Sequence, residues 1–188
     1  MKTLLTTILI FLNLVLFSQD KMNSEINKLF LNLNLADNPH QMIKKSNLKF
    51  EYAENQGIEW TGGNTKIYNT KFGNNDLIQS SILNGQIYIK QNEAEEKNGI
   101  YEILERIEFK NQDELMNEFY SLTSRFEKLG FKSKEIMTEN ENFEVKSHTN
   151  QIFIKYEDNI AELTFGYSLS QKESKNYVLI INFKNKIN

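Results

Sequence analysis

One amphipathic helix near the middle of the chain constrains the fold more than any other feature of the sequence. Asn111 can cap this helix, Glu114 stands at the capping-box position, and Gly130 can end it. The predicted helix runs from Gln112 to Leu129. Its apolar residues are spaced by four, three, four and three positions: Leu115, Phe119, Leu122, Phe126 and Leu129. Two heptads are too few for a coiled coil, so this stripe is predicted to pack on a sheet.

The residues on both sides of this helix alternate between apolar and polar side chains, which is the signature of half-buried strands. The predicted strands cover 48–52, 65–72, 77–83, 86–91, 100–110, 134–138, 143–156, 161–169 and 177–184. The dipeptide Asn84-Gly85 predicts a hairpin between 77–83 and 86–91, and Thr149-Asn150 predicts another within 143–156. Tyr177 to Phe183 is apolar on both faces, as expected of a central strand.

Two short helices are predicted before the first strand. The first has Asn23 or Ser24 as its cap and presents one apolar face, made of Ile26, Leu29, Phe30 and Leu33. The second begins at Asn38-Pro39, because Asn38 can cap and Pro39 suits the first helical position. Met42 and Ile43 are its apolar side.

The order of helices, strands, one helix and strands predicts an α+β fold, with antiparallel sheet packed by a few helices. The same order suggests two successive helix-then-sheet units, over 22–110 and 111–188, within a single domain over 19–188. The two halves show no alignable repeat of residues. In element order alone, the chain resembles small exported helix-plus-sheet modules, the BamE-like domains and the β-lactamase inhibitor proteins. This resemblance implies no functional residue.

The first eighteen residues are predicted to be a secretory signal peptide. Lys2 supplies a positive start, an apolar run extends from Leu4 to Phe17, and the small residue Ser18 precedes a polar stretch. The run is shorter than the roughly 20 residues of a membrane span. An uncleaved anchor is the alternative, because Leu16 is large for a cleavage site. We expect export to the periplasm or the exterior, with no stable membrane span after cleavage.

The composition narrows the chemistry available to the chain. It has 188 residues, a formal net charge of −3 and no cysteine, which excludes disulfides, thiolate catalysis and cysteine-based zinc sites. Arg106 and Arg125 are the only arginines, so we expect no nucleic-acid partner. The sequence has no P-loop, dinucleotide-binding glycine motif, nucleophile elbow or zinc-binding H-E-x-x-H motif. No catalytic residue, cofactor or metal is therefore predicted.

The two histidines and the acidic run are expected to be ordinary solvent-exposed residues. His40 falls in the first turn of a short helix and His148 near a predicted hairpin tip. A site that combines a histidine with carboxylates stays open as the alternative. Glu93, Glu95 and Glu96 lack the spacing of a calcium-binding EF-hand and are expected in a solvated loop.

Trp60 is the sequence's main candidate for an interaction residue. It is the only tryptophan and stands beside Gly62 and Gly63, in a region of weak strand signals. A tryptophan is usually a core anchor, but tryptophan is also enriched at interface hot spots. Trp60, Gly62 and Gly63 therefore form a candidate interaction surface.

Three classes of function fit these observations. The preferred one is an exported, non-catalytic binding or protein-interaction module, which would contact an unidentified protein or envelope component through a sheet face or the Trp60 loop. The second is a small hydrolase of envelope polymers that uses a carboxylate pair, with Glu51, Glu54 and Glu59 as first candidates. The third is a carrier that encloses an apolar ligand between helix and sheet.

Overall fold

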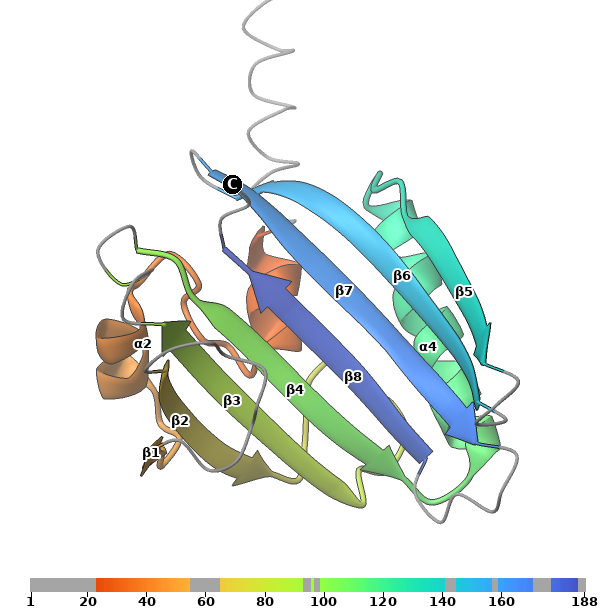
Figure 1. Ribbon diagram of the computed structural model, residues 1–188, viewed down its shortest axis with the longest axis horizontal. Coiled ribbons are helices and arrows are strands. Elements are labelled where there is room, and N and C mark those ends of the chain that lie inside the picture. The colour runs from red at the N-terminus through yellow and green to blue at the C-terminus, as the bar shows by residue number, and fades with distance from the viewer. Residues whose placement is uncertain are drawn as a thin grey trace, which may run out of the picture.

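A computed structural model of the chain describes residues 23–54, 65–92, 96, 99–140, 145–156, 159–170 and 177–185. Within them, one eight-stranded antiparallel sheet has helices on one of its faces, which confirms the α+β class (Figure 1). The helices are α2 (Pro39–Lys45), α4 (Gln112–Lys128) and a helical segment over residues 23–29. The strands are β1 (Glu51–Glu54), β2 (Thr65–Phe72), β3 (Asn84–Asn92), β4 (Glu102–Phe109), β5 (Lys134–Asn140), β6 (Val145–Tyr156), β7 (Asn159–Ser170) and β8 (Tyr177–Lys184).

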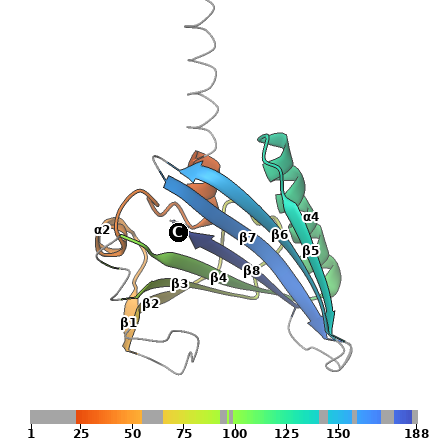
Figure 2. The same cartoon turned by 45° about the horizontal axis from the view of Figure 1, so that its top comes forward.

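The sheet joins two meanders of four strands each. Its order is β1-β2-β3-β4-β8-β7-β6-β5, so the strands before α4 fill one half and those after it fill the other. The two halves meet where β4 pairs antiparallel with β8, in a register that sets Arg106 opposite Ile180. The sheet twists strongly between its edge strands β1 and β5, as Figure 2 shows. As expected, the doubly apolar strand β8 lies at the centre.

The predicted N-terminal helices are present. In the helix over 23–29 and the turn after it, the apolar face is fully buried: Ile26, Leu29, Phe30 and Leu33. The Asn38 side chain accepts a hydrogen bond from the Gln41 backbone N–H at 3.0 Å, and Pro39 opens α2. Met42, on the inner side of this short helix, is buried in the core. Both helices therefore form in the predicted segments. The cap at Asn38 is confirmed, whereas Asn23 and Ser24 lie within the first helix.

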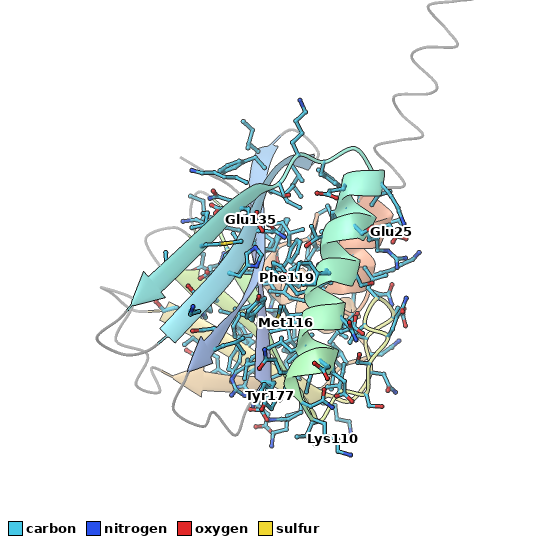
Figure 3. All side chains as sticks on the ribbon, turned by 90° about the vertical axis from the view of Figure 1, so that its right-hand side faces the viewer. Glu25, Lys110, Met116, Phe119, Glu135 and Tyr177 are labelled. Atoms are coloured by element: carbon cyan, nitrogen blue, oxygen red, sulfur yellow. The ribbon has the colours of Figure 1, made fainter. Side chains whose placement is uncertain are left out.

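Helix α4 also forms as predicted. The Asn111 side chain accepts from the Glu114 N–H at 2.9 Å, and Gly130 ends the helix region with a φ of 91°, which favours glycine. The apolar stripe faces the sheet and is at most 1% exposed at four positions: Leu115, Phe119, Leu122 and Phe126. Figure 3 shows Phe119 between the helix and the sheet.

The two faces of the sheet differ because side chains alternate along each strand. In β4, Ile103, Ile107 and Phe109 are buried on the side of α4, whereas Leu104 and Arg106 lie half-buried on the other side. The helix over 23–29 lies on the same side as α4 (Figures 1 and 2). We call these two sides the helix-covered face and the open face.

The predicted hairpin at Asn84-Gly85 is wrong. These two residues open β3, and Gly85 pairs with Ile107 of β4. Residues 73–83 form a loop instead of a strand, and Leu77 and Ile78 are buried in the core of the helix-covered face. The carboxylate of Glu118 on α4 accepts hydrogen bonds from the backbone of this loop, and these contacts outweigh the local preference for a turn.

The predicted turn at Thr149-Asn150 is also wrong, because β6 is one strand of 12 residues. The Asn150 side chain is buried and donates to the Thr123 hydroxyl on α4 at 2.7 Å. Thr149 lies opposite Gly166 of β7. Asn150 therefore lies in a strand and not in a turn, because its side-chain amide hydrogen-bonds to α4.

Within the described ranges, no helix is both long and apolar enough to cross a bilayer. The predicted signal peptide lies in residues 1–22, outside these ranges. At the first strand, the prediction of 48–52 differs from the observed β1, which begins at Glu51. Leu48 and Phe50 instead pack partly buried against the core before the strand begins.

Candidate functional site

The open face of the sheet carries a hollow of about 710 Å³. It extends across β3, β4, β8, β7 and β6, and its apolar lining includes Tyr88, Leu104 and Ile180. Hydroxyl side chains line the margin on β6 and β7: Ser147, Thr149, Thr164 and Ser168. The volume lies within the range of roughly 300–1,000 Å³ typical of small-molecule sites.

Gly166 on β7 gives the hollow its depth. The register places Gly166 between Thr149 of β6 and Ile180 of β8. A Cβ atom at this position would lie 2.5 Å from the Thr149 hydroxyl oxygen and 2.6 Å from the His148 carbonyl oxygen. Any larger residue at position 166 would therefore push β6 away or fill part of the hollow.

The charged margin of the hollow, on β3 and β4, is internally neutralised. The Lys90 ammonium lies 3.8 Å from the Glu102 carboxylate, which also accepts a hydrogen bond from the Asn182 side chain at 2.8 Å. The Arg106 guanidinium contacts the carboxylate of Glu108. Because each cation has a carboxylate neighbour, the hollow offers no surplus positive charge for a polyanion.

A second cleft, of about 470 Å³, lies at the edge of the helix-covered face. Tyr120 lines it from α4, and strands β5 to β7 contribute Met137, Lys146, His148, Tyr167 and Leu169. The prediction that His148 is exposed is wrong, since only 6% of it is accessible. Because β6 is one continuous strand, His148 lies mid-strand under Phe119, with 4.5 Å between their ring centroids.

His148 is contacted on both ring nitrogens. Its Nε2 atom lies against the Glu135 carboxylate of β5, and its Nδ1 atom is 3.4 Å from the Tyr167 hydroxyl of β7. Burial, then the charge and hydrogen bond of Tyr120, and then the charge of Glu135 raise the pKa of the Tyr167 phenol. The site therefore links an imidazole, two phenols and a carboxylate from four elements. The apolar residues Ile152 and Ile154, in phase with His148, are the sequence signal for its burial.

Two carboxylates that are at most 2% exposed, Glu105 and Glu118, were not predicted from the sequence. Glu105 of β4 is fully buried, and the Asn75 side chain donates to it at 3.3 Å. Burial raises the pKa of Glu105 well above its usual value, and the hydrogen bond from Asn75 opposes this only in part. Glu105 has the same strand phase as Ile103 and Ile107, so the alternation did mark it as inward-facing.

Glu118 of α4 is the second buried carboxylate. It accepts the backbone N–H groups of Gln79 and Ser80 at 3.0 and 2.5 Å. In the same loop, the Asn75 side chain donates to the Leu29 carbonyl at 2.7 Å. These contacts fasten residues 73–83 over the core, in place of the hairpin that was expected.

Most of the residues proposed from the sequence lie outside the part of the chain that the structure describes. Trp60, Gly62 and Gly63 lie outside the described residues, as do Glu59, Glu93 and Glu95 and the side chain of Glu54. Glu51 is exposed on the edge strand β1, and His40 is exposed on α2. Glu96 forms an ion pair with Lys66 at 2.8 Å. In the part of the chain that the structure describes, no three histidine, aspartate or glutamate side chains converge as a metal site.

No protein-family model, curated protein or solved structure matches this chain. The hollow and the second cleft are the two candidate sites in the described part of the chain.

Proposed function

We propose that this protein is an exported, non-catalytic binding module, and that the hollow on its open face contacts a partner protein or an envelope component. One observation carries this proposal. Side chains fill the helix-covered face, where Leu115, Phe119 and Phe126 are at most 1% exposed. On the other side of the same sheet, Leu104 and Ile180 are only partly buried, in a hollow that no helix of the described chain covers.

The lining of the hollow favours an amphipathic occupant. Leu104, Ile180 and the ring of Tyr88 offer apolar contact at the centre. The hydroxyl groups on β6 and β7 offer hydrogen bonds on one side, and the Lys90–Glu102 pair lies on the other. Protein interfaces share this arrangement of an apolar centre with a polar rim. An extended segment of a partner with alternating apolar and polar groups would match it.

The hydrolase alternative has less support at this hollow. Glycoside hydrolysis uses two carboxyl groups about 5–9.5 Å apart. Among the described residues that line the hollow, Glu102 is the single carboxylate, and Lys90 and Asn182 already engage it. Glycoside hydrolysis needs two carboxyl groups at this separation. The hollow has one, and the side chains of Glu54 and Glu59 lie outside the described part of the chain.

If the protein is a carrier, its apolar ligand would bind in the hollow and not in the space between helix and sheet where the sequence placed it. The discriminating measurement is extraction of purified protein with organic solvent, followed by mass spectrometry. A stoichiometric amphiphile that copurifies with the parent, and is lost in a Leu104→Glu variant, would favour a carrier over a protein-interaction module.

Export is part of the same proposal. The apolar run from Leu4 to Phe17, followed by Ser18, supports signal cleavage near residue 18. Intact-mass measurement on protein from its native host should show loss of about the first eighteen residues. The segment with Trp60, Gly62 and Gly63, which lies between β1 and β2 in the sequence, is proposed as a further contact surface of the exported chain.

We also infer that the chain is built from two successive helix-then-sheet units. Each half of the chain supplies helix followed by a four-strand meander, and the last strands of the two halves, β4 and β8, pair antiparallel. This arrangement is what two equivalent units related by a twofold axis would produce. Separately expressed chains over 22–110 and 111–188 should then reassemble on mixing, and two halves that stay apart would contradict the idea.

Site-specific photo-crosslinking in the native host tests the binding surface. A photoreactive residue at Thr164, in the hollow, should give a discrete adduct that a second substitution, Leu104→Glu, abolishes. The matched control is Phe153 on β6, which is 54% exposed and does not line the hollow. Equal adducts from positions 164 and 153, or adducts that survive Leu104→Glu, would refute the hollow as the contact surface.

A further inference from the structure

Strand β5 forms one edge of the sheet, and within the described chain its outer side has no strand neighbour (Figure 1). Its register with β6 is unbroken over all seven residues, so no bulge interrupts this edge. The residues from Lys134 to Thr138 are all exposed, including Ile136 at 37% and Met137 at 68%. An unpaired strand of this kind presents backbone N–H and C=O groups that can pair with another chain.

The other edge strand, β1, is better protected against such pairing. It has four residues, and its first residue, Glu51, is exposed. Short edge strands and charged side chains on an edge both discourage pairing with other chains. Strand β5 is therefore the edge of this sheet that is more suited to a contact between chains.

Helix α4 leaves β5 uncovered. The main contacts of α4 with the sheet are to β4, β7 and β8. The second cleft lies between the helix and this edge, where Tyr120 and Met137 are 52% and 68% exposed. A further strand can therefore lie alongside β5 without meeting the helix.

We propose that β5 is the contact surface between two copies of this chain. The two β5 strands pair antiparallel about a twofold axis perpendicular to the sheet, and they join two eight-stranded sheets into one. A twofold contact uses the same surface of both copies, so the strand must be complementary to itself.

Strand geometry limits the registers in which β5 can pair with itself. Directly opposite residues of an antiparallel pair have their side chains on the same face of the sheet. A twofold axis perpendicular to the sheet keeps each face on its own side, so one residue must lie on the axis and face its own copy. An axis at residue 136 sets residue 135 opposite residue 137, and residue 134 opposite residue 138.

Charge favours the axis at Ile136. An axis at Lys134 or at Glu135 sets two identical charges against each other. An axis at Met137 sets Glu135 opposite Glu139. Like charges that lie directly opposite are destabilising, and the axis at Ile136 brings none together along β5.

Apolar contact favours the same axis. Ile136 pairs with Thr149, which lines the hollow, so Ile136 lies on the open face. An axis at Ile136 sets the two isoleucine side chains against each other on that face. An axis at Thr138 instead sets Ile136 opposite Asn140, and fewer residues of the two strands then overlap.

The pairing places both hollows on one side of the joined sheet, because the axis is perpendicular to the sheet and the two open faces point in the same direction. Two linked sites bind a partner with repeated contact points more tightly than one site does. This gain in avidity rests on the proposed function of the hollow, whereas the pairing of β5 does not.

Single cysteines test the register, because the chain has no cysteine of its own. In the proposed pairing, the two Cα atoms at position 136 lie about 4.5–5.5 Å apart, within the range of a disulfide. Ile136→Cys should therefore give a disulfide-linked dimer on mild oxidation. The matched control is Thr138→Cys, which changes an exposed residue on the same face. Its two Cα atoms lie about 14 Å apart, too far for a disulfide.

Sedimentation equilibrium tests the pairing without a cysteine. One strand pair is a small interface beside the roughly 1,200 Å² or more that stable complexes bury, so we expect a reversible dimer whose fraction rises with concentration. Ile136→Lys sets two ammonium groups against each other and should weaken dimerisation at least about tenfold. Tyr52→Lys adds the same charge on β1, where the side chain is 53% exposed, and should leave dimerisation unchanged.

Three outcomes would overturn the proposal. The parent chain could stay monomeric at every concentration, with no disulfide formed by Ile136→Cys. Ile136→Cys and Thr138→Cys could form disulfides at equal rates, which would indicate random collision or another register. A parent dimer that Ile136→Lys leaves intact would show that the copies meet elsewhere. A failure of the crosslinking test at position 164 would remove the proposed role of the hollow and leave the β5 dimer standing.

Discussion

The two faces of the sheet share the same strands but have different surroundings. On β8, Ile181 points into the helix-covered face and is fully buried, whereas its neighbour Ile180 is only partly buried in the hollow. On β4, fully buried Glu105 and half-buried Arg106 are divided in the same way. Because side chains alternate along a strand, each strand contributes to a packed core and to an accessible surface at once. The comparison predicts that substitutions on the two faces have separable effects on stability and on binding.

The largest loss of stability is expected at the centre of the helix-covered face. Phe119 contacts His148, Phe165 and Tyr167, with ring centroids 4.5, 5.8 and 5.0 Å away. Phe119→Ala should reduce the free energy of unfolding by about 3–5 kcal/mol, as expected for an aromatic ring removed from a core. Urea denaturation measures the change. Phe153→Ala on the open face is the control, and a similar loss in both variants would erase the distinction between the faces.

A smaller loss is expected where α4 holds the loop over the core. Glu118→Ala leaves the N–H groups of Gln79 and Ser80 without their acceptor and should cost about 1–3 kcal/mol. Exposed Glu127 on the same helix is the matched control, and Glu127→Ala should change the free energy of unfolding by less than about 0.5 kcal/mol. Hydrogen exchange should locate the extra opening in residues 73–83, and unchanged protection there would contradict the assigned role.

Glu105 gives the helix-covered face a dependence on pH. Its pKa is raised in the folded chain, so the folded state holds this proton more tightly than the unfolded state does. The stabilising contribution is present below the ordinary pKa of glutamate and is lost as the pH rises toward the raised value. This residue should lower the free energy of unfolding by up to about 1.4 kcal/mol per pH unit in that interval.

Glu105→Gln tests this assignment, because it keeps the shape and removes the ionisation. Denaturation curves at a series of pH values should show a flatter dependence for the variant and greater stability than the parent at neutral pH. Glu102→Gln, on the open face of the same strand, is the control. A parent and a Glu105→Gln variant with parallel pH profiles would show that Glu105 ionises without cost to the fold.

Local signals in the sequence predicted the elements that local physics determines. The caps Asn38 and Asn111 and the turn glycine Gly130 have the predicted roles, and β2 and β8 have the predicted bounds. The turn predictions were wrong where residues distant in the sequence form hydrogen bonds with the predicted turn or with the loop beside it. Asn150 finds Thr123 on α4, and the loop before Asn84-Gly85 is tied down by Glu118.

The candidate sites were harder to predict than the fold. The hollow combines Tyr88 with Ile180, two residues that line the same surface only because β4 pairs with both β3 and β8. The second cleft depends on the burial of His148, which followed from the length of β6 and not from the residue type. Without the strand order, neither arrangement is visible in the sequence.

The smallest effect on stability is expected from the hollow itself, and the adjacent pair on β8 isolates it. Ile181→Ala removes a fully buried side chain and should cost about 2–5 kcal/mol. Ile180→Ala makes the same chemical change one residue earlier, where the side chain is only partly buried, and should cost less than about 1 kcal/mol. In the crosslinking assay at position 164, Ile180→Ala should nevertheless weaken the adduct, because it removes part of the apolar centre. A folded Ile180→Ala variant with undiminished crosslinking would mean that the partner does not touch this strand, and a loss of stability equal to that of Ile181→Ala would mean that the open face is core as well.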